Sequence, residues 1–106
     1  MTCRLDDPVG AVRERIAQSG YGFALVTTPR GILLGRLRRS ALDCDPELRA
    51  EERMEPGPST VRADTHAAEL AQRLANRGLH WAIVTDPEGR LLGVAGREDL
   101  ERAQSP

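Results

Sequence analysis

The sequence predicts an α+β fold in which one unit of strand, helix, strand, strand and helix occurs twice. The first reason is an internal repeat: residues 23–42 and 81–100 carry the same pattern of apolar residues, glycines and prolines at a constant shift of 58 positions. The second reason is that each copy has two short apolar runs around a turn with Pro and Gly, which is typical of a hairpin of buried strands. Because a three-stranded sheet of this size is not stable alone, we expect the two small sheets to pack on each other with pseudo-two-fold symmetry and to leave clefts between the repeats.

The first repeat begins with a short strand and an amphipathic helix. Residues 2–5 form an edge strand, and Asp6 or Asp7 is expected to cap the helix, with Pro8 at the first helical position. Gly20 ends this helix, since glycine accepts the left-handed conformation found there. The apolar residues of the helix recur on one face, at Val9, Val12 and Ile16.

A hairpin follows this helix. Residues 23–26 are expected to form a buried strand and residues 32–34 its antiparallel partner, joined by a turn at residues 29–31. Gly35 falls inside the second strand, where a missing side chain often lets another backbone or a ligand approach closely. The repeat pattern predicts a helix after this strand.

The chain divides into three segments. Residues 1–45 form the first repeat, residues 46–58 a linker, and residues 59–106 the second repeat. The linker is charged and can form a short helix before Pro56 and Pro58 stop it, because proline removes a backbone donor and clashes with a preceding turn. We expect it to lie on the surface as a bridge.

The second repeat follows the same order. Residues 59–61 form a short strand, and Asp64 or Thr65 caps a helix. Glu98 and Asp99 lie in the first turn of a last helix, where acidic side chains suit the helix dipole. The apolar face of the first of these helices consists of Ala67, Leu70, Ala71 and Leu74.

Composition excludes several classes of function. The net charge is −1, the isoelectric point is about 6.1 and aromatic residues make up 3%, which disfavours nucleic-acid binding. No apolar run approaches the ~20 residues that cross a bilayer, and the first residues do not resemble a signal peptide, so we expect a cytoplasmic protein that does not bind membranes. Cys3 and Cys44 are expected to be reduced thiols.

No catalytic motif is present, and we expect no enzymatic activity. His66 and His80 lack companions at the spacing of metal ligands, so we expect no metal site. His80 precedes Trp81 in the chain and is expected at the mouth of a cleft between the repeats. Trp81 corresponds to Phe23 in the first repeat, so we interpret it as a core residue, with stacking on an adenine as the alternative.

Residues 54–103 resemble a cystathionine-beta-synthase (CBS) domain. The resemblance rests on Met54, Pro58 and Thr60-Val61, on Asp64-Thr65, on the apolar strand and acidic turn, and on Gly93-Val94 with Asp99-Leu100. The first half is similar to a more divergent copy. The resemblance implies a stand-alone tandem CBS pair, also called a Bateman module, which binds AMP, ADP, ATP or S-adenosylmethionine and no other cofactor. It also implies a homodimer and an unknown regulated protein partner.

The family's ligand signature is a Gly, two apolar residues, Thr or Ser, two variable residues and Asp. The Asp accepts hydrogen bonds from the ribose hydroxyls, and the hydroxyl residue and the helix N-terminus donate to phosphate. In the second repeat this signature retains Asp99 but has Gly96 at the Thr/Ser position; in the first repeat Arg38 and Ala41 occupy the Thr/Ser and Asp positions. The ligand-binding residues that the resemblance implies are Asp99, Gly96, Arg97, Glu98, Thr60, Ala82, Ile83, Arg38 and Arg39.

Several alternatives remain open. Asp99 is either a ribose ligand or a charge that favours the helix dipole. Arg36, Arg38 and Arg39 either bind a polyphosphate or form a solvated face balanced by nearby acidic residues, Asp43, Asp45 and Glu47. For the whole protein, the two readings are a regulatory module that binds an adenosyl ligand and a degenerate pair that serves dimerisation or protein interaction without a ligand. Nucleic-acid binding through the arginines is a weaker third reading.

Overall fold

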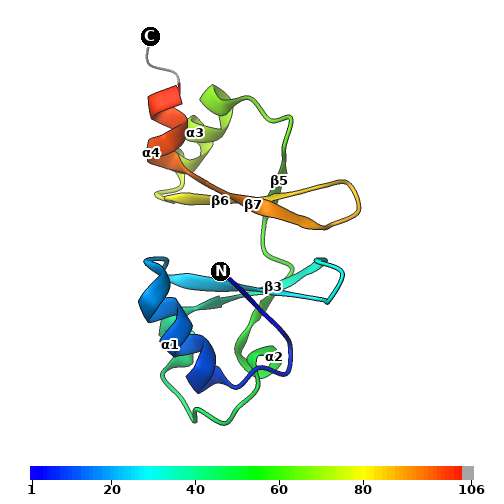
Figure 1. The fold of residues 1–106 in the computed structure, drawn as a ribbon. Coiled ribbons are helices and arrows are strands. Elements are labelled where there is room, and N and C mark those ends of the chain that lie inside the picture. The colour runs from blue at the N-terminus through cyan, green and yellow to red at the C-terminus, as the bar shows by residue number, and fades with distance from the viewer. Residues whose placement is uncertain (104–106) are drawn as a thin grey trace. The chain divides into compact units, whose positions relative to one another are not determined.

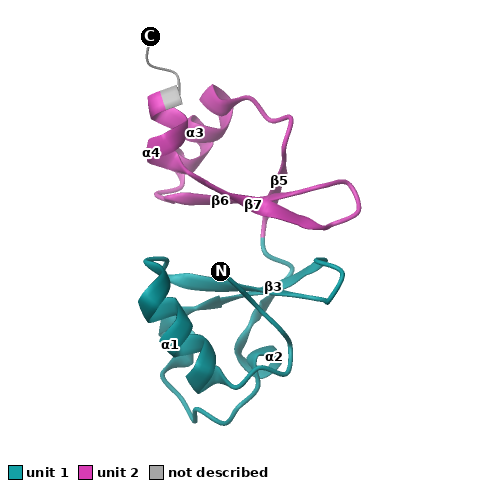
Figure 2. Ribbon diagram, viewed as in Figure 1, with its two compact units in different colours: residues 1–58 teal, residues 59–106 magenta. Residues whose placement is uncertain are grey.

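A computed structural model describes residues 1–103. The chain forms two compact units, Met1–Pro58 and Ser59–Pro106, which Figure 2 shows in separate colours. Both combine a small sheet with helices, which confirms the predicted α+β class and the predicted tandem repeat (Figure 1).

The first unit contains a four-stranded sheet in the order β1-β2-β3-β4. Strand β1 is parallel to β2 and is connected to it through α1, since a parallel pair requires a crossover, whereas β2, β3 and β4 are antiparallel. The elements are β1 (Thr2–Cys3), α1 (Val9–Ser19), β2 (Phe23–Thr27), β3 (Leu33–Arg38), the 3₁₀ helix η1 (Arg39–Leu42), α2 (Ala50–Arg53) and β4 (Glu55–Pro56).

The core of the first unit lies between α1 and the sheet. The predicted apolar face of α1 is confirmed, because its three residues are at most 2% exposed. Ala24, Val26 and Leu37 meet this face from alternate positions of β2 and β3, as the pleat of a strand requires. Gly20 ends α1 with a φ of 80°, which confirms the predicted left-handed end.

The second unit contains a three-stranded sheet in the order β5-β6-β7. Strand β5 is parallel to β6, which pairs with β7 as an antiparallel hairpin. Helices α3 and α4 lie side by side and pack on each other (Figure 1). The elements are β5 (Thr60–Arg62), α3 (Ala67–Asn76), β6 (Trp81–Thr85), β7 (Leu91–Gly96) and α4 (Arg97–Ala103). The core here is smaller, with Leu70, Leu74 and Ala82 at its centre.

The two hairpins repeat each other in register. Phe23 lies opposite Arg38 in the first unit, and Trp81 lies opposite Gly96 in the second, each shifted by the 58 positions of the sequence repeat. Both hairpins also have a register irregularity at the same place, between residues 26 and 27 and between residues 84 and 85. The repeat in the sequence is therefore a repeat of backbone geometry.

Residues 46–58, which the sequence assigned to a linker, contribute to the interior of the first unit. Ala50 is fully buried in its core, and β4 adds the fourth strand to its sheet. Gly35 permits this pairing, because a Cβ at that position would lie 2.7 Å from Met54 Sδ and 2.8 Å from Glu55 O. The close approach expected at Gly35 is thus confirmed, and the neighbour is the backbone of β4.

The predicted helix caps were wrong. Helix α1 begins after Pro8 and α3 after His66. The loop before α2 satisfies the start of α1, since Val9 N–H donates to Leu48 O at 2.8 Å and Gly10 N–H donates to Pro46 O at 2.9 Å. A backbone segment distant in sequence thus takes the role that the prediction gave to an aspartate.

The last element of the first repeat also differs from the prediction. Residues 39–42 form the 3₁₀ helix η1 in place of a full α-helix, while the equivalent residues of the second repeat begin α4. Leu42 at the end of η1 is fully buried in the core of the first unit. Within residues 1–103, no helix combines the length and the apolar character needed to cross a bilayer.

Candidate functional site

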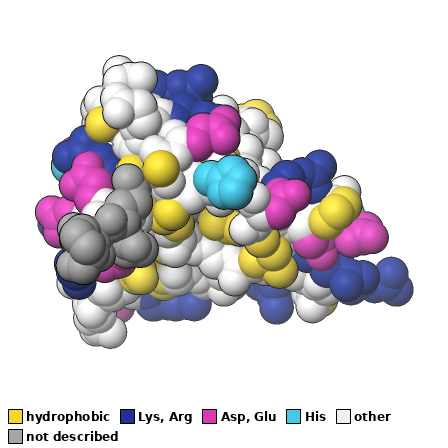
Figure 3. Space-filling model, turned by 90° about the horizontal axis from the view of Figure 1, so that it is seen from above, with side chains coloured by type: hydrophobic (Ala, Val, Ile, Leu, Met, Phe, Trp, Pro, Cys, Tyr) yellow, Lys and Arg dark blue, Asp and Glu magenta, His cyan; other side chains and the backbone are white. Residues whose placement is uncertain are grey.

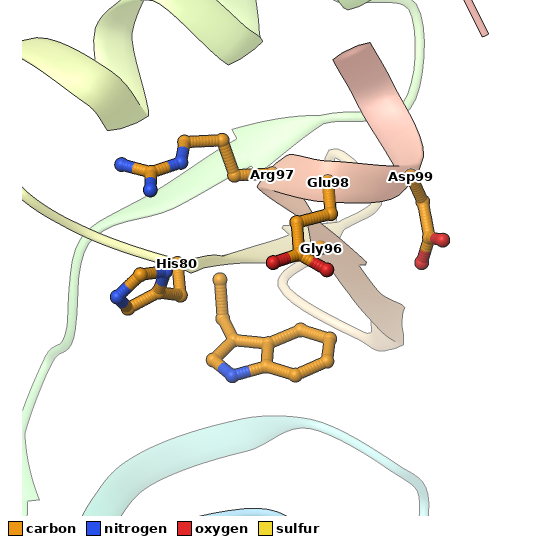
Figure 4. A pocket seen from close by; sticks show the side chains of 6 residues that line it. His80, Gly96, Arg97, Glu98 and Asp99 are labelled. Atoms are coloured by element: carbon orange, nitrogen blue, oxygen red, sulfur yellow. The ribbon is translucent and has the colours of Figure 1, made fainter. Parts of the chain in front are cut away.

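A pocket of about 310 Å³ opens in the second unit where β6, β7 and α4 meet. A pocket of this size is at the lower end of those that hold small-molecule ligands. It brings together four of the residues that the sequence assigned to ligand binding and adds two others (Figure 4). Its lining consists of His80, Trp81, Gly96, Arg97, Glu98 and Asp99.

Strand pairing builds the pocket. Trp81, the first residue of β6, lies opposite Gly96, the last residue of β7, and Arg97 N–H donates to His80 O at 2.8 Å where β7 passes into α4. The chain before β6 and the start of α4 are thus held next to each other. Residues that are 15 and 17 positions apart in sequence therefore line one cavity.

Gly96 determines how close the side chains of this pocket can lie. A Cβ at Gly96 would be 3.0 Å from Trp81 Cζ3 and 3.2 Å from Asp99 Oδ2. Both distances are shorter than ordinary van der Waals contacts. A Thr or Ser at this position would therefore require the indole ring or the carboxylate to shift by a few tenths of an ångström.

The charges of the pocket are mixed. Glu98 and Asp99 are exposed in the first turn of α4, as predicted. Asp99 Oδ1 lies 3.5 Å from Arg102 Nη2, and Arg97 Nε lies 3.8 Å from Glu101 Oε1. In Figure 4 the side chain of Arg97 extends away from Asp99, whereas Glu98 projects from the helix between them. The lining thus contains two carboxylates and one guanidinium, with the guanidinium on the side away from Asp99.

Five of the expected ligand residues lie outside this pocket lining, three of them in the second unit and two, Arg38 and Arg39, in the first. Thr60 is exposed in β5, in register with Ile83 of β6. Ala82 is 6% exposed and belongs to the core formed with α3. Ile83 is 4% exposed. Their assignment as ligand-binding residues stays a prediction.

In the first unit the arginines of β3 contact a single glutamate. Arg36 Nη2 donates to Glu55 Oε2 at 3.1 Å, and Arg38 Nε donates to Glu55 Oε1 at 2.5 Å. The hydrogen bond from Arg36, followed by that from Arg38, lowers the pKa of the Glu55 carboxyl against the effect of desolvation. Arg39 is exposed at the start of η1. The charge balance expected from Asp43, Asp45 and Glu47 is thus provided for two of the arginines by Glu55 on β4.

Two of the pocket residues were not among the assigned ligand residues. His80, expected at the mouth of a cleft, lines this pocket. The interpretation of Trp81 as a core residue was wrong, because the side chain is 39% exposed and lines the same cavity. Its position opposite a glycine follows from the hairpin register, and the Gly96 that replaces Thr or Ser was the sequence signal for it.

The other kinds of site to consider among the described residues are metal sites, charged surface patches and further pockets. Within residues 1–103, no group of three or more His, Cys, Asp and Glu side chains is placed to hold a metal ion. On the face shown in Figure 3, acidic and basic side chains are interspersed with hydrophobic ones. A second pocket, of about 440 Å³, lies in the second unit beside the turn between β6 and β7 and includes Leu92, which is 57% exposed.

Comparisons with known proteins agree with this fold. Residues 50–105 match the model of the CBS domain. The magnesium transporter MgtE of Thermus thermophilus is 34% identical over 79 residues, which is 74% of this chain and 18% of the transporter. The chain therefore spans less than a fifth of the length of this relative.

Solved structures give the same result. The cytosolic domain of the Mg²⁺ channel MgtE, solved in complex with ATP, has a TM-score of 0.84 and 28% identity and covers 97% of this chain and 44% of its own. The CBS domains of a transcriptional regulator from Streptococcus pneumoniae have a TM-score of 0.83 and 20% identity, covering 93% of this chain and 84% of their own. CBSX2 in complex with AMP has a TM-score of 0.84 and 19% identity, covering 97% and 85%.

Proposed function

Because the chain belongs to the CBS domain family, we propose that it is a regulatory module whose second unit binds the adenosyl part of a small molecule in the pocket beside Asp99. The observation that carries this proposal is the placement of the Asp99 carboxylate and the Trp81 ring against Gly96, at one side of a cavity of ligand size. Two proteins of similar structure were solved with ATP and with AMP, which supports an adenosyl ligand here.

Two residues, Asp99 and Trp81, have a defined role in this proposal. The Asp99 carboxylate accepts hydrogen bonds from the ribose hydroxyls, because an ionised carboxylate offers acceptors in the spacing of a diol. The exposed part of the Trp81 ring provides a face on which the adenine stacks. Arg38, Arg39, Thr60, Ala82 and Ile83 are kept as further contacts that the family resemblance implies.

Isothermal titration calorimetry with AMP, ATP and S-adenosylmethionine tests the proposal directly. Asp99→Ala should weaken the binding of whichever ligand binds by about tenfold, the effect of one charged hydrogen bond of ~1.5 kcal/mol. Glu88→Gln is the matched control, since Glu88 is an exposed acid in the turn between β6 and β7 and should leave the affinity unchanged. The absence of heat with all three ligands at millimolar concentration would refute the proposal.

The chain offers an internal reporter for the same test. Trp81 is the single tryptophan of the sequence, and it lines the pocket. Its fluorescence should therefore change on binding, with the same dissociation constant as the calorimetric one. A calorimetric signal that leaves the fluorescence unchanged would place the ligand elsewhere on the protein.

Regulation follows from the binding equilibrium. A ligand that binds one arrangement of the protein or of its dimer more tightly shifts the population toward that arrangement, and a partner reads the shift. The proposed role involves binding without chemical turnover. Since the similar region of MgtE is its cytosolic domain, we place this module in the cytoplasm as well.

A second candidate function is self-association without a ligand. It is favoured by Leu92, a large apolar side chain that is 57% exposed on β7, the last strand of the sheet order within residues 1–103. Sedimentation velocity at high micromolar concentration should then show a dimer that Leu92→Glu dissociates. A monomer of the unaltered chain at these concentrations would contradict this function.

A further inference from the structure

The next step rests on the proposed function and concerns the chemical class of the ligand. We infer that the pocket of the second unit prefers adenosine derivatives whose 5′ substituent is positively charged, such as a sulfonium, over those with an uncharged substituent, and that it binds those with a 5′ phosphate least tightly. The reasons lie in Gly96, in the two carboxylates and in the position of Arg97.

The packing around Gly96 disfavours the hydroxyl side chain that would donate to a phosphate. A side chain at Gly96 would start 3.0 Å from Trp81 Cζ3 and 3.2 Å from Asp99 Oδ2, so neither Thr nor Ser fits without displacing one of them. The aromatic ring and the carboxylate thus lie in close contact with the position from which a Thr or Ser side chain would project. The Trp81 and Asp99 side chains therefore pack against the glycine that replaces the hydroxyl residue.

The charges that face the cavity are those that attract a cation. Glu98 and Asp99 follow each other at the start of α4, and both line the pocket. A phosphate placed here would meet two carboxylates, and like charges at short range disfavour binding even at the dielectric of a protein surface. A sulfonium or ammonium would be attracted by the same groups.

The Arg97 guanidinium, which is the cation in the pocket lining, points toward Glu101. Arg97 Nε lies 3.8 Å from Glu101 Oε1, one helical turn further along α4, and Figure 4 shows its guanidinium on the side away from Asp99. To reach a phosphate beside Asp99, the Arg97 side chain would have to leave this partner and change its rotamer. Arg102 lies 3.5 Å from Asp99 but is outside the pocket lining.

Trp81 supplies the second element of a cation site. The face of an indole ring attracts a cation within about 6 Å of its centroid, more strongly than the rings of Phe or Tyr. Aromatic rings are the groups by which proteins recognise quaternary ammonium ligands, and a sulfonium carries the same single positive charge. The first unit has the opposite chemistry at the equivalent positions, where Phe23 lies opposite Arg38.

A matched pair of ligands tests this inference. S-adenosylmethionine and S-adenosylhomocysteine differ by one methyl group and by the charge on sulfur, so their affinity ratio measures recognition of the cation. Titration calorimetry should give S-adenosylmethionine about tenfold tighter than S-adenosylhomocysteine, and both tighter than AMP. Equal affinities for the first two, or an AMP affinity equal to or above theirs, would overturn the inference and leave the proposed function in place.

A charge variant locates the selectivity. Glu98→Gln should reduce the ratio between the two sulfur ligands to about twofold and raise the affinity for AMP several-fold, because one like charge is removed from the cavity. Glu101→Gln is the control on the same helix, and it should leave the ratio unchanged because Glu101 does not line the pocket. Since Glu98 is exposed, the variant should keep the unfolding temperature of the parent, and this is measured alongside.

The outcomes separate the two proposals. If no adenosine derivative binds, the proposed function fails, and the inference fails with it. If they bind and Glu98→Gln leaves both the ratio and the AMP affinity unchanged, the selectivity does not come from this carboxylate and the inference alone is refuted.

Discussion

Gly96→Ala tests the packing from which the pocket is built. The new Cβ would lie 3.0 Å from Trp81 Cζ3 and 3.2 Å from Asp99 Oδ2, about half an ångström closer than an ordinary contact. Overpacking of this kind costs about 1–3 kcal/mol, while replacing a strand glycine by alanine gains about 0.5–1 kcal/mol from the reduced entropy of the unfolded chain. The balance is a net loss of about 1 kcal/mol.

A double-mutant cycle with Trp81→Ala isolates the contact. Without the indole ring the overpacking is relieved, so Gly96→Ala should become stabilising by about 0.5 kcal/mol in that background. The coupling free energy between the two positions is then about 1.5 kcal/mol. A sign change of one substitution between two backgrounds is difficult to produce by other means.

The assay is urea unfolding followed by circular dichroism, because the Trp81→Ala variant has no tryptophan fluorescence. The transition of the second unit is identified in the parent chain by the fluorescence of Trp81, its single tryptophan. Distant sites usually add within about 0.3–0.5 kcal/mol, so a coupling below this limit would refute the contact between Gly96 and the ring.

Three further predictions concern the first unit and its surface. Ile16→Ala should destabilise the first unit by about 2–5 kcal/mol, whereas Leu92→Ala on the surface of the second should change stability by less than ~0.5 kcal/mol. Equal effects in chemical unfolding would contradict the exposed fractions of 2% for Ile16 and 57% for Leu92. Since burial raises the pKa of the Cys3 thiol to about 11, iodoacetamide at pH 8 should modify Cys44 first and Cys3 only after unfolding, and mass spectrometry that finds Cys3 modified in the folded protein would refute this. The hydrogen bond from Arg36 lowers the pKa of the Glu55 carboxyl in the folded state, so the contribution of Glu55 to stability is present above pH 4.5 and is lost as the pH falls further. The Glu55→Gln variant should therefore lose less stability over this acid range than the parent chain. Parallel pH profiles of the free energy of unfolding would show that the ion pairs of Glu55 contribute nothing.

Patterns that are local in the sequence predicted the elements well. The face of α1 and both hairpins followed from the spacing of apolar residues and from Pro and Gly in the turns, because these features act within a few residues. The repeat shift of 58 positions predicted that the two hairpins would share one geometry, and their registers agree. The apolar face assigned to α3 is largely buried too.

The candidate site was predicted in part for the same reason. Gly96 and Asp99 are three positions apart, at the end of β7 and the start of α4, so their proximity is a local matter that the family signature already encodes. His80 and Trp81 join them through the register of β6 with β7. That register describes how two strands pair, and it cannot be derived from the spacing of residues along either strand alone.

Local chemistry in the sequence thus accounts for which segments are helices and strands and for the retained aspartate. Contacts between distant segments account for the rest: the loop carbonyls that cap α1, the fourth strand beside Gly35, and the ring that closes over Gly96. The physical reason is that a backbone N–H can be paired by a carbonyl from any segment, and the space beside a glycine can be filled by any segment that fits it. Which segment arrives depends on how the whole chain folds back on itself.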